Sequence, residues 1–271
     1  MDTVSIYRLN NIIAPSFKDQ MSKLVGIIIR KVTSVQAVFF LEANDNGTLF
    51  LLVITSDEEQ RQAKGLGSTI EESCREIAKL VALVHHSSSF QNGIANDNPF
   101  FNRALHCPVI YLSGGLVLPA RKPLGCSPAG LPDMKLWDRW YSQGKDFLSG
   151  AEYYLKTGAY GAALFSLQQC VESLLIAVIR SVLGYRVNNH NLSKLLDITQ
   201  MFTDDLAAVF NLEDAESVQL FDLLKHAYVN VRYKDTFEPD TKSLETLYRV
   251  TKHFVSVVEL VHQKYLLTNS I

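Results

Sequence analysis

The feature that most constrains the fold is the helical spacing of apolar residues through the second half of the chain. From residue 136 onward, strongly periodic segments are separated by short interruptions at Gly158, Gly184 and Pro239. Long helices with short connections pack as antiparallel bundles. The sequence therefore predicts an all-α antiparallel helical bundle over residues 136–271. The clearest apolar stripe in it consists of Leu164, Leu167, Val171, Leu174, Val178 and Val182. The expected helices are 136–156, 159–183, 192–202, 204–210, 215–235 and 242–267.

The first half of the chain alternates helical segments with β-branched and aromatic runs. Two such runs flank the turn sequence Asn44-Asp45-Asn46-Gly47, which predicts a β-hairpin. Ser68 and Thr69 are expected to cap a helix that ends at Ile77. The expected helices are 15–32, 68–77 and 98–105, and the expected strands are 35–41, 49–54, 79–84 and 108–112. The chain is thus predicted to be α+β, with a small mixed α/β domain at 1–118, a linker rich in proline and glycine at 119–135, and the bundle at 136–271.

Charge and composition restrict the class of partner. Residues 1–135 contain 13 basic and 12 acidic residues, and the remainder contains 13 basic and 16 acidic residues. Neither half has the basic excess that binds duplex DNA through its phosphates. No apolar run is expected to reach the length of a membrane-spanning helix. The four cysteines have no CxxC spacing, and the first residues do not resemble a secretory leader, so free thiols and a cytoplasmic location are expected.

Polar residues interrupt the apolar helices at three places, and each place has two interpretations. Gln168 and Glu172 are four residues apart and fit a buried hydrogen-bonded pair better than a metal site, because no further carboxylates have suitable spacing. His190 precedes a helix that Asn191 is expected to cap, although the same helix N-terminus could attract phosphate. Cys170 lies near the apolar stripe and is predicted to be a core thiol.

The third place is the stretch from Lys225 to Asp235, which carries Tyr228, Arg232 and Tyr233. On one continuous helix, residues 225, 228, 232 and 235 would share a stripe. A surface ion pair between Arg232 and Asp235 would contribute little stability. The alternative is an arginine that contacts phosphate, flanked by aromatic rings that stack on a base.

The order of these residues in the second half resembles the HEPN domain, a helical bundle often found beside minimal nucleotidyltransferases. The matching elements are Ala151-Glu152-Tyr153-Tyr154-Leu155, Gly158, Tyr160, Gln168, Glu172, His190-Asn191-Leu192, and Tyr228 with Arg232 and Tyr233. The resemblance implies a nucleotide or RNA as partner and a homodimer formed through the bundle. It also implies a nucleotide-binding site at His190, Lys225, Tyr228, Arg232, Tyr233 and Asp235. The last helix is expected to have more apolar residues than the bundle core needs, and these are expected to pack against the partner protomer. They are Phe254, Val257, Val258 and Val261.

Departures from the patterns of related enzymes argue against catalysis. HEPN ribonucleases carry an arginine followed by four to six residues and a histidine, but His226 precedes Arg232 here, and only three residues separate Arg249 from His253. A nucleotidyltransferase-like first domain would place two metal-binding aspartates near Thr48 and Phe50. Without those carboxylates, a Mg²⁺-dependent transfer has no ligands for its metal. No catalytic residue, metal or cofactor is assigned, apart from a possible bound nucleotide.

The leading hypothesis is therefore a bacterial-type, two-domain regulatory or nucleotide-binding protein with a degenerate nucleotidyltransferase-like domain and a HEPN bundle. Two alternatives remain open. One is an enzyme, either a HEPN-type ribonuclease or an active nucleotidyltransferase of a toxin–antitoxin-like system. The other is a protein-interaction module without a small ligand.

Overall fold

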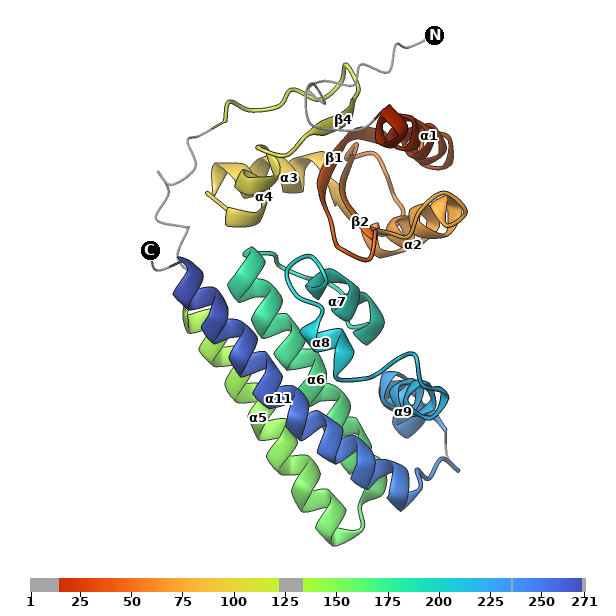
Figure 1. The fold of residues 1–271 in the computed structure, drawn as a ribbon, viewed down its shortest axis with the longest axis vertical. Coiled ribbons are helices and arrows are strands. Elements are labelled where there is room, and N and C mark those ends of the chain that lie inside the picture. The colour runs from red at the N-terminus through yellow and green to blue at the C-terminus, as the bar shows by residue number, and fades with distance from the viewer. Residues whose placement is uncertain (1–14, 122–133, 235, 270–271) are drawn as a thin grey trace. The chain divides into compact units, whose positions relative to one another are not determined.

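The computed structural model describes residues 15–121, 134–234 and 236–269. The chain divides into two compact units, Met1–Gly130 and Leu131–Ile271 (Figure 1). The division falls inside the segment 119–135 that the sequence predicts as a linker. The α+β class is confirmed, because the first unit is built on a sheet and the second on helices.

The first unit has a four-stranded mixed sheet covered by helices on both faces. Its elements are α1 (Pro15–Lys31), β1 (Val35–Ala43), β2 (Leu49–Thr55), α2 (Ala63–Cys74), β3 (Leu80–His86), α3 (Ser87–Ala95), α4 (Pro99–Ala104) and β4 (Val109–Leu112). The strand order is β3-β2-β1-β4. β1 is antiparallel to both β2 and β4, whereas β2 and β3 are parallel. All four predicted strands are present.

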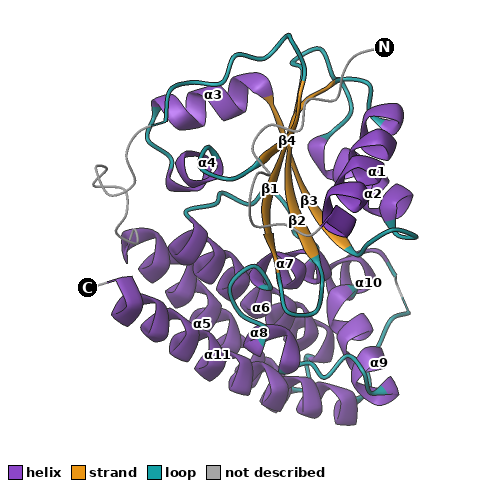
Figure 2. Ribbon diagram, turned by 45° about the horizontal axis from the view of Figure 1, so that its top comes forward, coloured by secondary structure: helices purple, strands orange, loops and turns teal. Residues whose placement is uncertain are grey.

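Burial on both faces explains why β2 is a continuous apolar run. Figure 2 shows α1 and α2 on one face of the sheet and α3 and α4 on the other. Every residue of β2 is buried, as expected for a strand with helices on both sides. Alternate residues serve the two faces: Leu51 and Val53 belong to the core with α1 and α2. On the other face, Phe39 of β1 packs against Phe90 of α3.

One sequence prediction for the first unit is wrong, and one helix was not predicted. Ser68 and Thr69 do not cap a helix, because α2 begins earlier, after Gln62. Their hydroxyls instead donate to the carbonyls of Lys64 and Gly65, one turn back in the same helix. The helix α3, which directly follows β3, was not predicted from the sequence. The predicted short helix at 98–105 is present as α4, and Asn98 caps it, since its side chain accepts from the backbone N–H groups at 100 and 101.

The second unit is built around three long helices. Its elements are α5 (Met134–Thr157), α6 (Tyr160–Leu183), α7 (Leu192–Thr199), α8 (Asp205–Ala208), α9 (Ala215–Lys225), α10 (Ala227–Tyr233) and α11 (Thr241–Asn269). Helices α5 and α6 form an antiparallel hairpin, and α11 runs beside both (Figure 1). Gly158 has a φ of 78° between α5 and α6, a left-handed conformation that glycine adopts without strain.

Helix α6 is the centre of this unit. It is buried on nearly all sides, and Gly144 of α5 allows a close approach, because a Cβ there would lie 2.8 Å from Cγ of Leu174. By length and composition alone, α6 is apolar enough to cross a membrane, so the expectation that no run reaches that length is wrong. In the structure 83% of the qualifying window is buried against other protein.

Two further predictions for the bundle are corrected. The helix expected over 215–235 is interrupted at His226, which separates α9 from α10. The apolar residues thought to be surplus on the last helix are largely used within the bundle, since Phe254 and Val258 are fully buried and Val261 is only 6% exposed. The homodimer remains a prediction, without that support.

Candidate functional site

A row of polar side chains crosses the apolar surface of α6. Gln168 and Glu172 are 3% and 8% exposed, and Gln168 Nε2 donates a 2.9 Å hydrogen bond to Glu172 Oε2. Gln169 Nε2 donates to Gln168 Oε1 at 2.6 Å. The predicted buried pair is therefore present, and a third amide extends it. Burial of these groups is tolerated because each finds a partner.

His190 completes this row from the segment before α7. Its Nδ1 lies 2.6 Å from Glu172 Oε1, with the Glu172 side chain 10% exposed and the His190 side chain 83% exposed. A carboxylate can only accept, so Nδ1 carries the donated proton and Nε2 is the nitrogen left to solvent. The predicted cap is also confirmed, because Asn191 Oδ1 accepts from the N–H of Lys194. His190 is thus both next to a helix start and fixed by a buried carboxylate.

Arg232 forms a second cluster with aromatic rings on α10. Its Nη1 donates to the hydroxyl of Tyr228. Its guanidinium carbon lies 4.9 Å from the centre of the Tyr228 ring and 5.5 Å from that of Tyr233. All three side chains are exposed. Asp235, and with it the alternative of an Arg232–Asp235 ion pair, lies outside the described residues.

Helix α6 links the two clusters. The ring of Phe165 packs 6.1 Å from the ring of Tyr228, and Phe165 lies seven residues before Glu172. Residues at i, i+3, i+4 and i+7 share one face of a helix, so Phe165, Gln168, Gln169 and Glu172 form one stripe. The Arg232 cluster and His190 are therefore placed at two levels of the same face, about 10 Å apart along the axis.

Lys225 does not join this arrangement in the way the sequence predicts. It ends α9 and pairs with Asp222 through a 2.5 Å contact. The break at His226, whose ring nitrogen lies 2.8 Å from the carbonyl of Asp222, places Lys225 and Arg232 on different helices. The predicted stripe of residues 225, 228, 232 and 235 on one helix is therefore wrong, although Tyr228 and Arg232 remain in contact.

The first unit contains a polar cluster that sequence reasoning missed, at the carboxyl ends of the parallel strands β2 and β3. Asp57 accepts from the N–H and the hydroxyl of Ser88 at 3.0 and 2.6 Å, and from the hydroxyl of Ser87 at 2.8 Å. These bonds, those of Ser88 first, lower the pKa of Asp57. Asp57 therefore caps α3 from 30 residues away. The serines after His86 and the aspartate after β2 were the only signals in the sequence.

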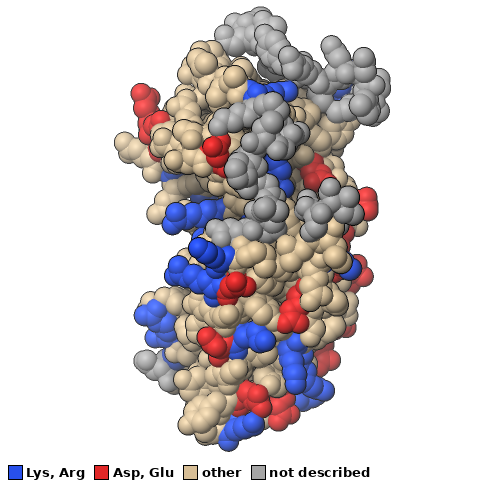
Figure 3. All heavy atoms as spheres, turned by 90° about the vertical axis from the view of Figure 1, so that its left-hand side faces the viewer, with Lys and Arg blue, Asp and Glu red and all other residues tan. Residues whose placement is uncertain are grey.

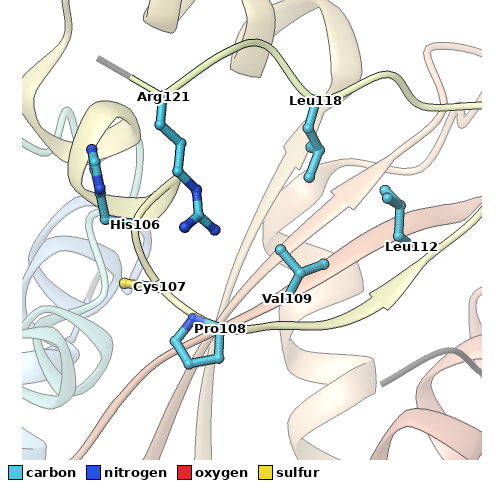
Figure 4. Close-up of a pocket in the computed structure, with 7 residues that line it drawn as sticks. All are labelled: His106, Cys107, Pro108, Val109, Leu112, Leu118 and Arg121. Carbon is cyan, nitrogen blue, oxygen red and sulfur yellow. The ribbon is translucent and has the colours of Figure 1, made fainter. Parts of the chain in front are cut away.

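The first unit also has a pocket of about 390 Å³, lined by His106, Cys107, Pro108, Val109, Leu112, Leu118 and Arg121 (Figure 4). Burial, then the carboxylate of Glu42, raises the pKa of the Cys107 thiol, while Arg103 and Arg121 act in the opposite direction. A thiol with a raised pKa is a poor nucleophile at neutral pH. The pocket is therefore a cavity in which Cys107 is not activated as a nucleophile.

Two further observations limit the chemistry. Among the residues that the structure describes, no three His, Cys, Asp or Glu side chains are grouped so as to hold a metal ion. On the lower part of the face shown in Figure 3, basic and acidic side chains are interspersed. Cys170 is fully buried, and burial raises its pKa to about 12, which confirms the predicted core thiol.

Comparison with known proteins assigns the helical unit. The family model described as "HEPN domain" matches residues 137–261. The helical unit contains a HEPN domain. The match includes α6, His190 and α10, so both clusters described above belong to the HEPN domain.

The crystal structure of TT1696 from Thermus thermophilus is similar at 20% identity, over 46% of this chain and 97% of that one, with a TM-score of 0.36. No curated protein matches the chain.

Proposed function

We propose that this protein binds a nucleotide or single-stranded RNA on the exposed face of its HEPN domain, and that binding serves regulation. The HEPN domain supports a role related to nucleotides or RNA, or a regulatory role. The finer assignment rests on one observation: α6 holds both the Arg232 cluster, through Phe165 and Tyr228, and His190, through Glu172.

The chemistry of the two clusters suits different parts of a nucleotide. Arg232 offers a planar fork of donors that matches phosphate, and the exposed Tyr233 and Tyr228 rings offer π-faces to a base. The separation of about 10 Å along α6 leaves room for one nucleotide or a short piece of RNA between Arg232 and His190. Neither the degenerate nucleotidyltransferase-like character of the first unit nor the homodimer is needed for this binding.

A thermal-shift screen with ATP, GTP and short single-stranded RNA tests the proposal. The parent is expected to gain stability with at least one of them, since a ligand that binds only the folded state raises its melting temperature. Arg232→Ala is expected to weaken binding about tenfold to a hundredfold, the loss of one charge-assisted contact. The matched control is Arg249→Ala, because Arg249 is an exposed arginine on α11 whose Nη2 donates to the hydroxyl of Thr246. The proposal fails if Arg232→Ala and the parent bind every ligand equally.

RNA cleavage is a second candidate, supported by the Glu172–His190 pair. A carboxylate that fixes Nδ1 of an exposed histidine leaves Nε2 in position to transfer a proton. If the domain cleaves RNA, short single-stranded RNA should be degraded by the parent and not by His190→Ala. Absence of cleavage by the parent would leave binding as the function.

A further inference from the structure

Two arginines lie over one tryptophan at the other end of α6, and the charge of a third arginine acts on one of them. The guanidinium carbons of Arg139 and Arg180 lie 5.8 and 5.1 Å from the centre of the Trp140 ring. Arg139 and Trp140 belong to α5, and Arg180 belongs to the last turn of α6. Arg186 follows in the segment before α7 and is exposed. Burial lowers the pKa of Arg180, and the charges of Arg186 and then Arg139 lower it further.

None of these three guanidinium groups has a carboxylate partner among the residues that the structure describes. Other arginines near carboxylates pair with them: Arg61 binds Glu59 through two nitrogens, and Arg75 contacts Glu72 at 2.6 Å. The Nε of Arg180 is instead buried without a hydrogen-bond partner, and so is Nε1 of Trp140. Packing on the Trp140 ring, rather than any hydrogen bond, therefore orients the Arg180 side chain.

Helix electrostatics account for only part of this arrangement. A cation in the last turn of α6 is stabilised by the negative end of the helix dipole, which gives Arg180 a structural role. The helix dipole does not explain why the charges of Arg186 and Arg139 lie close enough to lower the pKa of Arg180. Like charges destabilise one another, so this proximity is unfavourable. An anion placed among the three would remove that repulsion and supply the missing acceptor.

The position of the tryptophan indicates which part of a ligand would bind. Two guanidinium groups lie over the Trp140 ring, so the ring is engaged in cation–π contacts rather than left for a base. Arginine forks match the oxygens of phosphate in a bidentate manner. We propose that Arg139, Arg180 and Arg186 form a second site of the HEPN domain, which binds the phosphate groups of a polyphosphate or a polynucleotide.

This site is separate from the Arg232 cluster. Arg180 lies 15 residues beyond Phe165 on α6, about 22 Å along the helix axis. The phosphate could belong to a free nucleotide or to the backbone of single-stranded RNA, and the shared chemistry is the charged phosphate oxygen. The two sources differ in whether a mononucleotide or inorganic triphosphate is enough.

The test measures binding of inorganic triphosphate and ATP by calorimetry, and of a labelled single-stranded RNA by fluorescence anisotropy. Arg180→Ala and Arg186→Ala are each expected to weaken binding about tenfold to a hundredfold, whereas Arg249→Ala should bind as the parent does. Arg186 is exposed between two helices, so its variant preserves the packing on Trp140 if Arg180→Ala does not fold. Far-UV circular dichroism checks the fold of each variant.

The outcomes separate this inference from the proposed function. Triphosphate binding that depends on Arg180 and Arg186 but not on Arg232 supports a second site for free polyphosphate. RNA binding with the same dependence, without triphosphate binding, supports a backbone-binding site. If the parent binds none of the three ligands, or if Arg180→Ala and Arg186→Ala bind as well as Arg249→Ala, the inference is overturned. Nucleotide binding lost only in Arg232→Ala would overturn it while leaving the proposed function intact.

Discussion

Glu172 on α6 holds His190 through a 2.6 Å contact between Oε1 and Nδ1, although 18 residues separate them in the chain. The same carboxylate accepts from Gln168 at 2.9 Å and from Gln169 at 3.3 Å. One buried acidic group therefore organises three donors and fixes the segment before α7 against the core of the bundle. Its loss would leave the buried Nε2 of Gln168 without its acceptor, whereas Gln169 would keep its bond to Oε1 of Gln168.

Glu172→Ala is accordingly expected to destabilise the HEPN domain by about 1–3 kcal/mol, the penalty for unsatisfied buried polar groups. The matched control is Glu152→Ala, which removes an exposed carboxylate paired with Lys156 and should change stability by no more than about 0.5 kcal/mol. Urea unfolding followed by tryptophan fluorescence measures the difference, because both tryptophans lie on α5. Equal effects of the two substitutions would contradict the organising role of Glu172.

Two glycines on α5 give a prediction about helix packing. A Cβ at Gly144 would meet Cγ and Cδ2 of Leu174 at 2.8 and 2.9 Å, whereas a Cβ at Gly150 has no neighbour closer than 3.8 Å. Alanine is the better helix former by about 0.8–1 kcal/mol, so Gly150→Ala should be neutral or stabilising. Gly144→Ala should instead destabilise the bundle, because overpacking costs about 1–3 kcal/mol.

Urea unfolding of both glycine variants, again followed by tryptophan fluorescence, checks this pair. The prediction concerns the sign of the difference between them, since the gain in helix propensity is common to both. If Gly144→Ala were as stable as Gly150→Ala, the close approach of α5 and α6 at Leu174 would be wrong.

A partly buried histidine makes the stability of the first unit depend on pH. Burial, and then the charge of His86, lowers the pKa of His85 to about 4, whereas an unfolded histidine titrates near 6.5. Between these values the unfolded state binds more protons, so stability is complete above about pH 6.5 and falls as the pH approaches 4. The loss is on the order of 3 kcal/mol.

His85→Phe removes this titration and keeps an aromatic ring beside Phe101, which His85 contacts edge to face at 5.0 Å between ring centres. Urea unfolding followed by far-UV circular dichroism from pH 7 to pH 4 should show a shallower decline in the variant. Tryptophan fluorescence reports only the second unit and should have the same pH dependence in both proteins. An unchanged decline by circular dichroism would show that His85 is not the cause.

The first unit is predicted to lack Mg²⁺-dependent nucleotidyl transfer. Phe50 on β2 is fully buried and Thr48 just before β2 is 1% exposed, and neither side chain carries the carboxylate that a Mg²⁺ site needs. Incubation with labelled ATP or GTP and Mg²⁺, with protein and RNA acceptors, should yield no labelled product. A product that disappears on addition of EDTA would contradict the prediction.

The sequence predicted those features that depend on local pattern. Continuous apolar runs gave the four strands, and helical periodicity gave the long helices of the bundle. The errors arose where distant residues decide the structure. Helix α3 begins among serines because Asp57 caps it from the loop after β2, and the pairing of His190 with Glu172 depends on how α6 and the following segment pack. The break between α9 and α10 at His226 was not predicted, because no glycine or proline marks it in the sequence.

The candidate site was predicted by residue type rather than by geometry. His190, Tyr228, Arg232 and Tyr233 were expected to cooperate, and α6 places His190 and Tyr228 along one face. The role of Phe165 in joining α10 to that face was not predicted, because a phenylalanine in an apolar helix is indistinguishable in sequence from any other core residue. The arginines at Trp140 were also missed. Arg139 and Arg180 lie more than 40 residues apart in the chain, so no local sequence pattern joins them.

Substitutions at both ends of the proposed site test whether His190 and Arg232 contact the same ligand. Each of His190→Ala and Arg232→Ala is expected to weaken binding of the nucleotide or RNA identified by thermal shift. Arg232→Lys should recover only part of the affinity, because lysine keeps the charge but cannot form the bidentate fork. The control Arg249→Ala should bind as the parent does.

A double-mutant cycle then decides between one site and two. If one ordered ligand spans both residues, the two losses should be coupled, with an interaction of about 0.5–3 kcal/mol measured by calorimetry. Independent contacts would instead add within about 0.3–0.5 kcal/mol, and the α6 face would then hold two unrelated sites. Loss of binding in Arg232→Ala alone, with His190→Ala unchanged, would limit the site to α10 and leave His190 with the structural role that its bond to Glu172 already provides.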